Sequence, residues 1–336
     1  MKNAQGGIVR ARRLDVMLAL LLGLLIVSGA ALAQGNLNSA GDPTSNVNLI
    51  GMTPDLADIP DTYNRQQNEP SCAIRPDDSA CIICAYNDYR GVDSPVGDSW
   101  QGVSQSCDAG DSWLSRLAPG HPGDIGVDLI PAEFAADPRV SAIPCMAILN
   151  FIAAFRDNND GVLAIQHWLE VEKEDADFYE PSKETWFADI GTSGRFIDKP
   201  DMLPVMDPPD QQGIPLTLVT EMENSALGEG GFITRDFPTG TLYAAYAVLT
   251  GSNSFKVLVK TSDDWGRTWK NQVLKLSEDQ NQVSGISLTA IDGKVLAVWR
   301  RLGDNNDLDS IMYSVISNGG KKATKAEVLA DICAFD

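Results

Sequence analysis

The chain has 336 residues, of which 43% are hydrophobic, so it can bury the core of one large domain or of two ordinary ones. It carries 46 acidic residues against 26 basic ones, a formal net charge of -20. This acidic excess argues against a nucleic-acid-binding surface and against adhesion to anionic lipid. It is typical of a soluble protein whose copies repel one another, and it does not indicate which partner the protein binds.

The first 33 residues have the pattern of a secretory signal peptide. Basic residues precede the apolar run MLALLLGLLIVSGA, and the small residues Ala-Leu-Ala at 31–33 suit a cleavage site. We therefore predict cleavage after Ala33 and a secreted or periplasmic protein. The alternative is an uncleaved anchor, although the apolar run falls short of a comfortable membrane span of ~20 residues. No later run is long enough to cross a bilayer, so no membrane span is expected after cleavage.

Residues 34–64 are polar and aperiodic, and we expect a flexible lead-in to one domain spanning 65–336. In that domain a unit of predicted strands recurs four times. Its first strand opens on an acidic residue and a proline in most copies (68–74, 136–143, 198–205 and, more loosely, 283–291). An apolar second strand follows (81–86, 151–156, 242–248 and 295–301). After a polar loop comes a third strand (100–106, 162–168, 255–262 and 311–317).

Two copies of the unit end in the same motif, Ser-x-Asp-x-Gly-x-(Ser/Thr)-Trp. Its residues are Ser106, Asp108, Gly110, Ser112 and Trp113 in the first copy, and Ser262, Asp264, Gly266, Thr268 and Trp269 in the third. Asp and Gly form turns, so we expect the Asp to accept backbone N–H bonds and the Gly to take a positive φ, while the Trp packs between units. Asp108 and Asp264 are therefore interpreted as turn clamps and not as catalytic acids. The second copy keeps only the ending, Glu184-Thr185-Trp186.

Four-stranded units that are too small to bury their own faces are expected to stack around a centre as a β-propeller. A β-sandwich is the alternative, but a sandwich has no reason to repeat one turn motif in register. The motif is the Asp-box, accompanied by Asn-Glu-Pro-Ser at 68–71 and Tyr-Asn-Asp-Tyr-Arg at 86–90. With these features the chain resembles the sialidase-like (BNR repeat) propellers, especially exported bacterial ones.

The resemblance implies an all-β propeller of six blades, with each Asp-box between the third and fourth strands of a blade, on the face opposite the active site. About four units fit in this chain. A truncated sequence, an unusual closure and an open sheet are the alternatives that this number leaves. An open sheet would expose an unpaired edge, which favours aggregation.

Propeller ligands usually bind at one mouth of the central channel, where the loops before the first strands meet the loops after the second strands. This scheme collects the carboxylates Glu69, Asp88, Asp137 and Asp198 and the arginines Arg90, Arg156 and Arg300. We expect the arginines to bind an anionic ligand through bidentate hydrogen bonds. The carboxylates are the candidate acids for a glycosidic oxygen.

By resemblance, a sialidase would use three arginines, an aspartate acid/base and a tyrosine nucleophile assisted by a glutamate. The family's Phe/Tyr-Arg-Ile-Pro motif is absent here, and the sequence nominates no tyrosine. The family's catalytic roles are therefore not transferred to single residues of this chain.

Two functions follow from these features. The first is an exported glycoside hydrolase of the exo-α-sialidase type that acts on anionic sugars. The second is a non-catalytic propeller that binds glycans or proteins. A glycan ligand is expected, no cofactor is expected, and the oligomeric state is not indicated. Calcium is a weaker alternative suggested by Asp-Asn-Asn-Asp at 157–160 and 304–307, where turn formation explains the sequence more simply.

Six cysteines in an exported chain make disulfides an option. Cys81 and Cys84 are three apart on a predicted strand, so they point to opposite faces and are poorly placed to pair. If residues 77–79 form a hairpin turn, Cys72 lies opposite Cys84 and the two become a candidate pair. Small buried hydrophobic cysteines are an equal alternative.

Overall fold

The computed structural model describes residues 67–90, 98–121, 132–154, 161–171, 178–190, 196–222, 231–251, 254–278, 280, 282–303 and 308–333. The predicted signal peptide and lead-in lie outside these residues, and so do Arg156 and both Asp-Asn-Asn-Asp loops. The described residues form 19 β-strands and no helix, so the all-β prediction is confirmed. In these ranges no helix exists that is long and apolar enough to cross a membrane.

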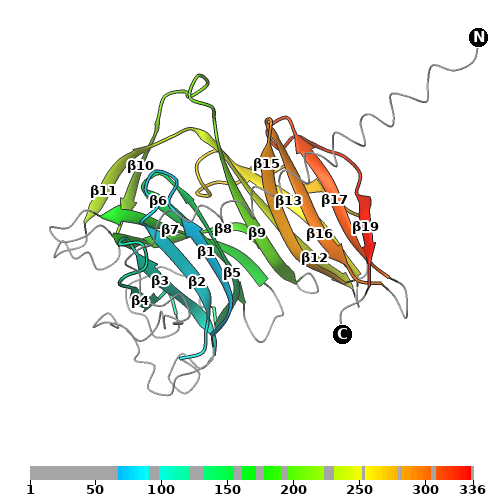
Figure 1. Cartoon of the computed structure of the whole chain (residues 1–336), viewed down its shortest axis with the longest axis horizontal. Helices are drawn as coiled ribbons and strands as arrows, with labels where there is room; N and C mark the ends of the chain where they lie inside the picture. The colour runs from blue at the N-terminus through cyan, green and yellow to red at the C-terminus, as the bar shows by residue number, and fades with distance from the viewer. Residues whose placement is uncertain are drawn as a thin grey trace, which may run out of the picture. The chain divides into compact units, whose positions relative to one another are not determined.

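Four antiparallel sheets follow one another along the chain, and we name them blades 1 to 4 (Figure 1). Blade 1 contains β1 (Gln67–Ile74), β2 (Ile82–Asp88), β3 (Trp100–Ser106) and β4 (Leu114–Leu117). Blade 2 contains β5 (Phe134–Ile143), β6 (Met146–Ala154), β7 (Gly161–Val171) and β8 (Phe178–Ile190). Blade 3 contains β9 (Ile197–Met206), β12 (Gly240–Gly251), β13 (Ser254–Ser262) and β14 (Leu274–Lys275).

Blade 4 contains β15 (Val283–Ile291), β16 (Lys294–Arg301) and β17 (Asp309–Ser317). Two short strands, β18 (Lys322–Ala323) and β19 (Glu327–Ile332), both pair with β17. Between β9 and β12 of blade 3 the chain forms a separate hairpin of β10 (Leu216–Glu221) and β11 (Phe232–Phe237).

The first strand of each blade lies next to the first strand of the following blade, in the order β1, β5, β9 and β15. Hydrogen bonds connect these strands: the Val140 N–H donates to Ser71 Oγ (3.1 Å), and the Leu288 N–H donates to Asp201 Oδ2 (2.6 Å). Sheets that start from neighbouring first strands and stack face to face are the blades of a β-propeller. The predicted fold is confirmed, with four blades in the described residues.

Apolar side chains fill the spaces between successive blades, because a single four-stranded sheet cannot bury both of its faces. Trp100 of blade 1 packs edge to face on Phe151 of blade 2, with the ring centroids 6.2 Å apart. Trp265 of blade 3 is 1% exposed and lies in the core shared with blade 2. Trp299 of blade 4 is fully buried in the core shared with blade 3.

Most strands differ from their predicted bounds by a few residues, and two differences are larger. β6 begins at Met146 and not at residue 151, because a turn with Cys145 at φ 62° returns the chain onto β5 at once. Glu184-Thr185-Trp186 does not end a turn as its counterparts do, but lies inside β8, where Thr185 and Trp186 pair with β7. Neither difference changes the order of the blades.

The two disulfides of the described residues both lie in blade 1. Cys72–Cys84 joins paired positions of β1 and β2, which is the pair that the hairpin argument favoured. Cys81–Cys107 joins the residue before β2 to the turn after β3. Cys145 and Cys333 are free thiols.

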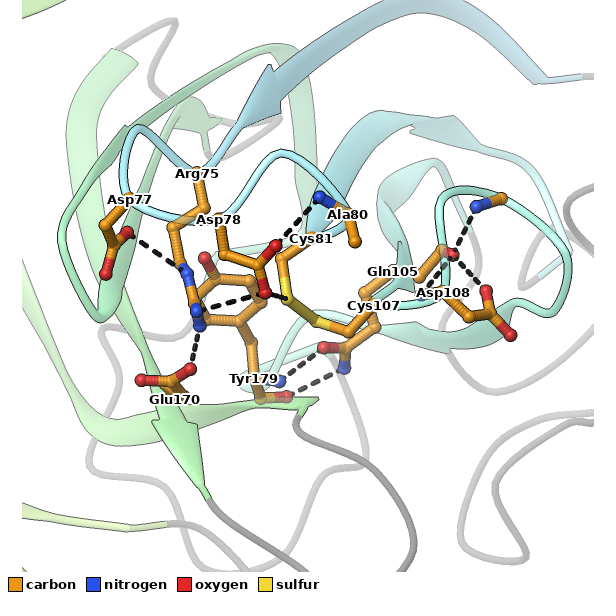
Figure 2. The surroundings of a disulfide bond; sticks show 12 residues. Arg75, Asp77, Asp78, Ala80, Cys81, Gln105, Cys107, Asp108, Glu170 and Tyr179 are labelled. Atoms are coloured by element: carbon orange, nitrogen blue, oxygen red, sulfur yellow. Dashed lines mark hydrogen bonds and ion pairs between the residues drawn. A yellow bond between two sulfur atoms is a disulfide. The ribbon is translucent and has the colours of Figure 1, made fainter. Parts of the chain in front are cut away.

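Polar contacts between blades 1 and 2 surround the second disulfide (Figure 2). The Arg75 guanidinium forms ion pairs with Asp78 (3.2 Å) and with Glu170 of β7. The Gln105 amide donates to the Tyr179 carbonyl (2.7 Å) and accepts a bond from the N–H of the same tyrosine. These buried contacts attach the outer part of blade 1 to blade 2.

Candidate functional site

The first strand of every blade is interrupted by a bulge at the same place. The pairing register breaks between Asn68 and Ser71 in β1, and at the equivalent points of β5, β9 and β15. The residue with positive φ in each bulge is Glu69 (53°), Asp137 (55°), Lys199 (50°) or Gly285 (59°). Because only glycine adopts this conformation freely, blades 1 to 3 hold a strained residue at one repeated position. Bulges re-aim side chains next to active sites, and strain of this kind marks candidate functional positions.

The second strand carries a buried aromatic residue in the register gap of each bulge. These residues are Tyr86, Phe151, Tyr246 and Trp299, and none is more than 4% exposed. The Tyr86 hydroxyl is held further by Ser104 Oγ and Ser115 Oγ, each at 2.9 Å. Every bulge is therefore backed by a large, tightly packed ring on the neighbouring strand.

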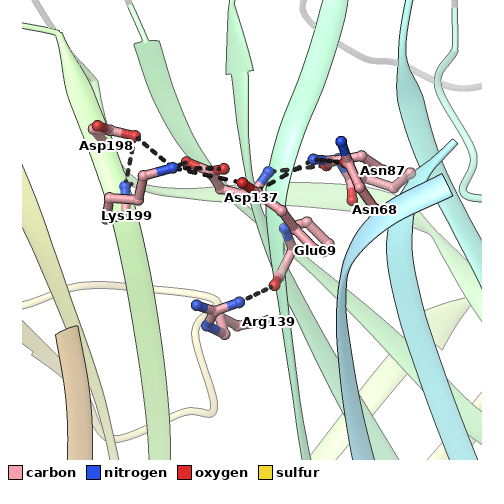
Figure 3. Close-up of polar contacts among 9 residues, drawn as sticks. Asn68, Glu69, Asn87, Asp137, Arg139, Asp198 and Lys199 are labelled. Atoms are coloured by element: carbon pink, nitrogen blue, oxygen red, sulfur yellow. Dashed lines mark hydrogen bonds and ion pairs between the residues drawn. The ribbon is translucent and has the colours of Figure 1, made fainter. Parts of the chain in front are cut away.

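The bulged residues bring their side chains together across blades 1 to 3 (Figure 3). Lys199 Nζ lies 3.3 Å from Asp137 Oδ1 and 3.8 Å from Glu69 Oε1. Asp198 places its Oδ1 3.9 Å from the same ammonium. We name Glu69, Asp137, Asp198 and Lys199 the inner-strand cluster. It contains three of the four acids predicted from the sequence.

Side chains of one blade bind the backbone of the next blade's bulge. Asn87 Oδ1 accepts the Asp137 N–H (3.0 Å), and Asp137 Oδ2 accepts the Lys199 N–H (3.4 Å). The Asn87 amide group donates to Asn68 Oδ1 (2.9 Å) and to Glu69 Oε2 (3.4 Å). A bulge leaves its extra N–H outside the strand ladder, and such a group needs another acceptor when it is buried. These bonds therefore fix the conformation of the bulges and the positions of the cluster's side chains.

The three carboxyl groups ionise unequally because Asp137 lies between the other two. Burial raises the pKa of Asp137, but hydrogen bonds from the two neighbouring carboxyl groups and the charge of Lys199 outweigh burial and lower the pKa to about 2. Burial and the hydrogen bond to Asp137 raise the pKa of Asp198 to about 6. The hydrogen bond to Asp137, and then burial, raise the pKa of Glu69. Asp137 is thus the anionic member, and its two neighbours hold protons more readily.

The cluster opens to solvent on the side of Glu69. The exposed fractions of the side chains are 45% for Glu69, 36% for Lys199, 27% for Asp198 and 13% for Asp137. Burial would lower the pKa of Lys199, but the attraction of Asp137, Asp198 and Glu69 outweighs burial and raises it. Glu69 is therefore the most accessible member of the cluster, and the anionic Asp137 is the most buried one.

Two of the three predicted ligand arginines bind carboxylates of their own blade. Asp88 is fully buried and accepts hydrogen bonds from the backbone N–H (2.9 Å) and the Nε–H (2.8 Å) of Arg90. Arg300 Nε–H donates to Oδ2 of the buried Asp309 (2.7 Å). Register places both pairs at the end of the blades that carries the bulges, but each guanidinium is already engaged. The third arginine, Arg156, lies outside the described residues.

The two motif turns, residues 106–113 and 262–269, contain the same hydrogen bonds. Asp264 Oδ1 accepts the Ser262 hydroxyl (2.7 Å) and the Thr268 N–H (2.8 Å), and its Oδ2 accepts the Thr268 hydroxyl (2.6 Å). The Trp269 indole donates to the Gly266 carbonyl (2.9 Å). The other turn repeats this pattern with Asp108, Ser106, Ser112, Trp113 and Gly110. Both glycines have a positive φ, 96° and 103°, as the turn requires.

The motif turns lie at the opposite end of the blades from the inner-strand cluster. Along the β2–β3 pairing of blade 1, Ser106 faces Ile82 at one end and Trp100 faces Asp88 at the other. The β12–β13 pairing of blade 3 runs in the same sense. The slight burial of Asp108 raises its pKa, but hydrogen bonds within its own turn outweigh burial and lower the pKa to about 2. This carboxylate is thus kept ionised by the turn that it holds together.

Lys199, Asn87 and Asn68 were not predicted as site residues from the sequence. Asp198 was predicted at the position equivalent to Glu69 and Asp137, whereas the structure puts Lys199 there. The signal was present, because all three bulged residues precede a proline (68–70, 136–138 and 198–200). Aligning the prolines in place of the acids would have found Lys199. Asn87 lies in the stretch Tyr-Asn-Asp-Tyr-Arg that marked the resemblance, but its role could not be predicted because it depends on blade 2 lying beside it.

No protein-family model and no curated protein matches this sequence. Among solved structures the chain is similar to Trypanosoma rangeli sialidase in complex with 2,3-difluorosialic acid, at 14% identity and a TM-score of 0.42, covering 77% of this chain and 37% of that one. It is similar to a GH43 endo-arabinanase from Bacillus licheniformis at 10% identity and a TM-score of 0.43, covering 78% of this chain and 79% of that one. It is also similar to the α-L-arabinofuranosidase Arb93A from Fusarium graminearum, at 10% identity and a TM-score of 0.47. This match covers 81% of this chain and 69% of that one.

The predicted propeller is confirmed by the order of the four blades in the described residues, and a sialidase, an endo-arabinanase and an α-L-arabinofuranosidase are among the solved structures to which the chain is similar. The matched part spans only 37% of that sialidase. The propeller fold itself follows from the blade order and pairing of this chain. Activity has to be argued from its own residues.

Proposed function

We propose that this chain is a glycoside hydrolase whose acid–base chemistry is carried by the inner-strand cluster. The supporting observation is a row of three carboxyl groups in which the middle one, Asp137, has a lowered pKa and its two neighbours have raised ones. Most glycosidases pair a carboxylic acid with a carboxylate, the two held roughly 5 to 9.5 Å apart. Here Asp137 separates the outer two groups, because both form a hydrogen bond with it.

The roles follow from ionisation and exposure. Asp198, with a pKa of about 6, gives its proton to the glycosidic oxygen as the bond between that oxygen and the anomeric carbon breaks. Glu69, the most exposed acid, takes a proton from a water molecule whose oxygen bonds to the same carbon. Asp137 stays ionised beside Lys199 and stabilises the positive charge that develops on the sugar ring.

Exo-α-sialidase activity is the finer form of this proposal, and it depends on arginines. It needs Arg90, Arg156 and Arg300 to hold a sugar carboxylate. Arg90 and Arg300 bind Asp88 and Asp309, which are at most 2% exposed, so a sialoside would have to compete with buried partners. The glycosidase proposal therefore rests on the carboxyl groups and not on the arginines.

Export is part of the proposal. It is supported by the signal pattern of residues 1–33 and by the disulfides of blade 1, since disulfides persist in oxidising compartments outside the cytoplasm. N-terminal sequencing of the protein recovered from the medium or the periplasm should start at Gln34. A start at Met1 would show that the segment is retained as an anchor.

The hydrolase proposal is tested by turnover of a panel of fluorogenic aryl glycosides, which includes neutral sugars and a sialoside. Asp198→Asn should lower kcat by about 10²- to 10⁴-fold, the usual effect of removing a general acid. In the wild type the rate should fall as the pH rises through about 6, where Asp198 loses its proton. Asp263→Asn is the matched control, because Asp263 is a carboxylate at the opposite end of the blades, in a motif turn, and its side chain is 60% exposed.

Each outcome decides between the candidate functions. If Asp198→Asn cleaves substrate at the wild-type rate and with the wild-type pH profile, Asp198 is not the general acid. Glycan binding without turnover of any substrate would replace the hydrolase with the non-catalytic glycan-binding propeller. Turnover of the sialoside alone would favour the exo-α-sialidase and would require Arg90 or Arg300 to leave its partner.

A further inference from the structure

The inner-strand cluster holds more negative than positive charge. Three carboxyl groups surround one ammonium, so the sum stays negative even when one of the carboxyl groups is protonated. Lys199 Nζ lies between 3.3 and 3.9 Å from an oxygen of each acid, so its charge is shared among all of them. Little of that charge is left to attract an anionic ligand.

The arginines that the structure describes at this end of the blades have hydrogen-bond partners as well, including Arg301, which donates to the Ser310 hydroxyl (3.0 Å). Arg139 of β5 donates to the Pro138 carbonyl (3.0 Å) and lies 3.8 Å from Asp201 of β9. Asp201 adds a further carboxyl group on the strand that carries Lys199. Arg90 and Arg300 bind carboxylates of their own blades. The polar side chains that complete the cluster, Asn68 and Asn87, are uncharged amides.

We infer that the inner-strand cluster takes an uncharged sugar and discriminates against sugars that carry a carboxylate. This inference rests on the proposed function and names the substrate class of the same site. Sugar hydroxyls can donate hydrogen bonds to the acids and accept them from Lys199 and Asn87. A sugar carboxylate would instead face the acids at a distance of a few ångströms and partly shielded from water. Repulsion at that range weakens binding roughly tenfold or more.

Lys199 sets the strength of this discrimination. Lys199→Met keeps the length of the side chain and removes the positive charge, so the acids repel a ligand carboxylate more strongly. Lys199→Arg keeps the charge and should preserve the wild-type preference. Lys275→Met is the matched control for the loss of one positive charge, because Lys275 lies on β14, the outermost strand of blade 3, and pairs with Glu278.

The experiment compares ligands that differ only in a carboxylate. Methyl galactoside against methyl galacturonide, methyl glucoside against methyl glucuronide, and lactose against sialyllactose are titrated into the disulfide-intact protein, and binding is followed by NMR. We expect the neutral member of at least one pair to bind about tenfold more tightly at low salt, and this ratio to shrink at high salt. In Lys199→Met the ratio should rise about fivefold further, whereas in Lys275→Met it should stay at the wild-type value.

Binding is measured separately from turnover so that the two proposals can fail separately. Neutral sugars that bind but are never cleaved would overturn the hydrolase and leave the substrate class standing. Equal or tighter binding of the carboxylated members would overturn the substrate class, and so would an identical ratio in Lys199→Met and Lys275→Met. Failure of every sugar to bind would overturn both proposals.

Discussion

The two ends of the blades both depend on aspartates, but they use them in opposite ways. At the motif-turn end, Asp108 and Asp264 accept hydrogen bonds from residues within four positions of themselves. At the bulged end, Asp137 and Asp198 come from different blades, and each forms a hydrogen bond with a second acid. The backbone at Asp137 is also in a conformation that favours glycine.

This difference shows which carboxylates the fold needs and which it tolerates. A turn aspartate satisfies donors that would otherwise be lost, so it stabilises the folded chain. Crowded acids on strained bulges oppose folding, and proteins retain such arrangements mainly at functional sites. Substitution of Asp198, whose pKa is raised, should therefore change stability in the opposite direction from substitution of a turn aspartate.

The largest expected effect comes from breaking the contact between the blade 3 turn and blade 2. Trp265→Ala removes a side chain that is 1% exposed, and the unfolding free energy should fall by about 3–5 kcal/mol. Urea denaturation followed by circular dichroism measures this loss. Trp269→Ala is the comparison, because Trp269 only partly packs against the same core, and it should cost less. Equal losses would mean that burial does not set the effect.

A smaller loss is expected when the clamp of the same turn is removed. Asp264→Ala leaves the Thr268 N–H and both hydroxyl groups without their acceptor, which should cost about 1–3 kcal/mol of unfolding free energy. Asp263→Ala, at the neighbouring position, removes an exposed ion pair with Lys270 and a long, exposed hydrogen bond from the Thr241 hydroxyl (3.4 Å), and should change stability by less than about 0.5 kcal/mol. If Asp263→Ala lost more unfolding free energy than Asp264→Ala, the motif turn would not be held by Asp264.

At the bulged end the sign of the stability change should reverse for Asp198 and not for Asp137. The folded-state pKa of Asp198, about 6, lies above the ordinary value of 3.8, so its contribution to stability is present below pH 4 and lost as the pH rises through 6. Asp198→Asn should therefore be more stable than the wild type at pH 7, by about 1 kcal/mol, and no more stable at pH 4. Asp137→Asn should be less stable at pH 7, because Asp137 has a lowered pKa. Chemical denaturation at both pH values would contradict this if both variants moved the same way.

The smallest effect is the acid sensitivity of the blade 1 turn. The folded-state pKa of Asp108, about 2, lies below the ordinary value of 3.8, so its stabilising contribution is present above pH 4 and lost as the pH falls through 2. The stability difference between the wild type and Asp108→Asn should therefore be constant above pH 4 and shrink in stronger acid. Thermal denaturation at a series of pH values measures the difference, and a gap that widens in acid would exclude the clamp.

The motif turns and the blade order could be predicted because they depend on nearby residues. Each turn closes within eight positions, so Ser106 to Trp113 contain all the information that the geometry needs. Strand alternation recurs in every unit, and β3 and β15 have the predicted bounds. The bounds of β6 failed because a tight turn at Cys145 has no strong sequence signal.

The candidate site could be predicted only in part because it forms between blades. Glu69 and Asp137 were found from their places at the starts of first strands, but Lys199 was missed because its carboxylate partners come from other strands as well as its own. Arg90 was chosen as a free ligand-binding group. Its partner Asp88 stands only two positions away, yet the pairing depends on how the end of β2 folds back.

The placement of both disulfides has a consequence for how the molecule comes apart. Their loops, with sequence separations of 12 and 26, close entirely within blade 1, so among the described residues oxidation cross-links one blade and leaves the others to non-covalent contacts. Blade 1 should therefore resist unfolding longer than blades 2 to 4. Partial digestion should leave blade 1 as the last intact part of the chain, and a reducing agent should remove this difference.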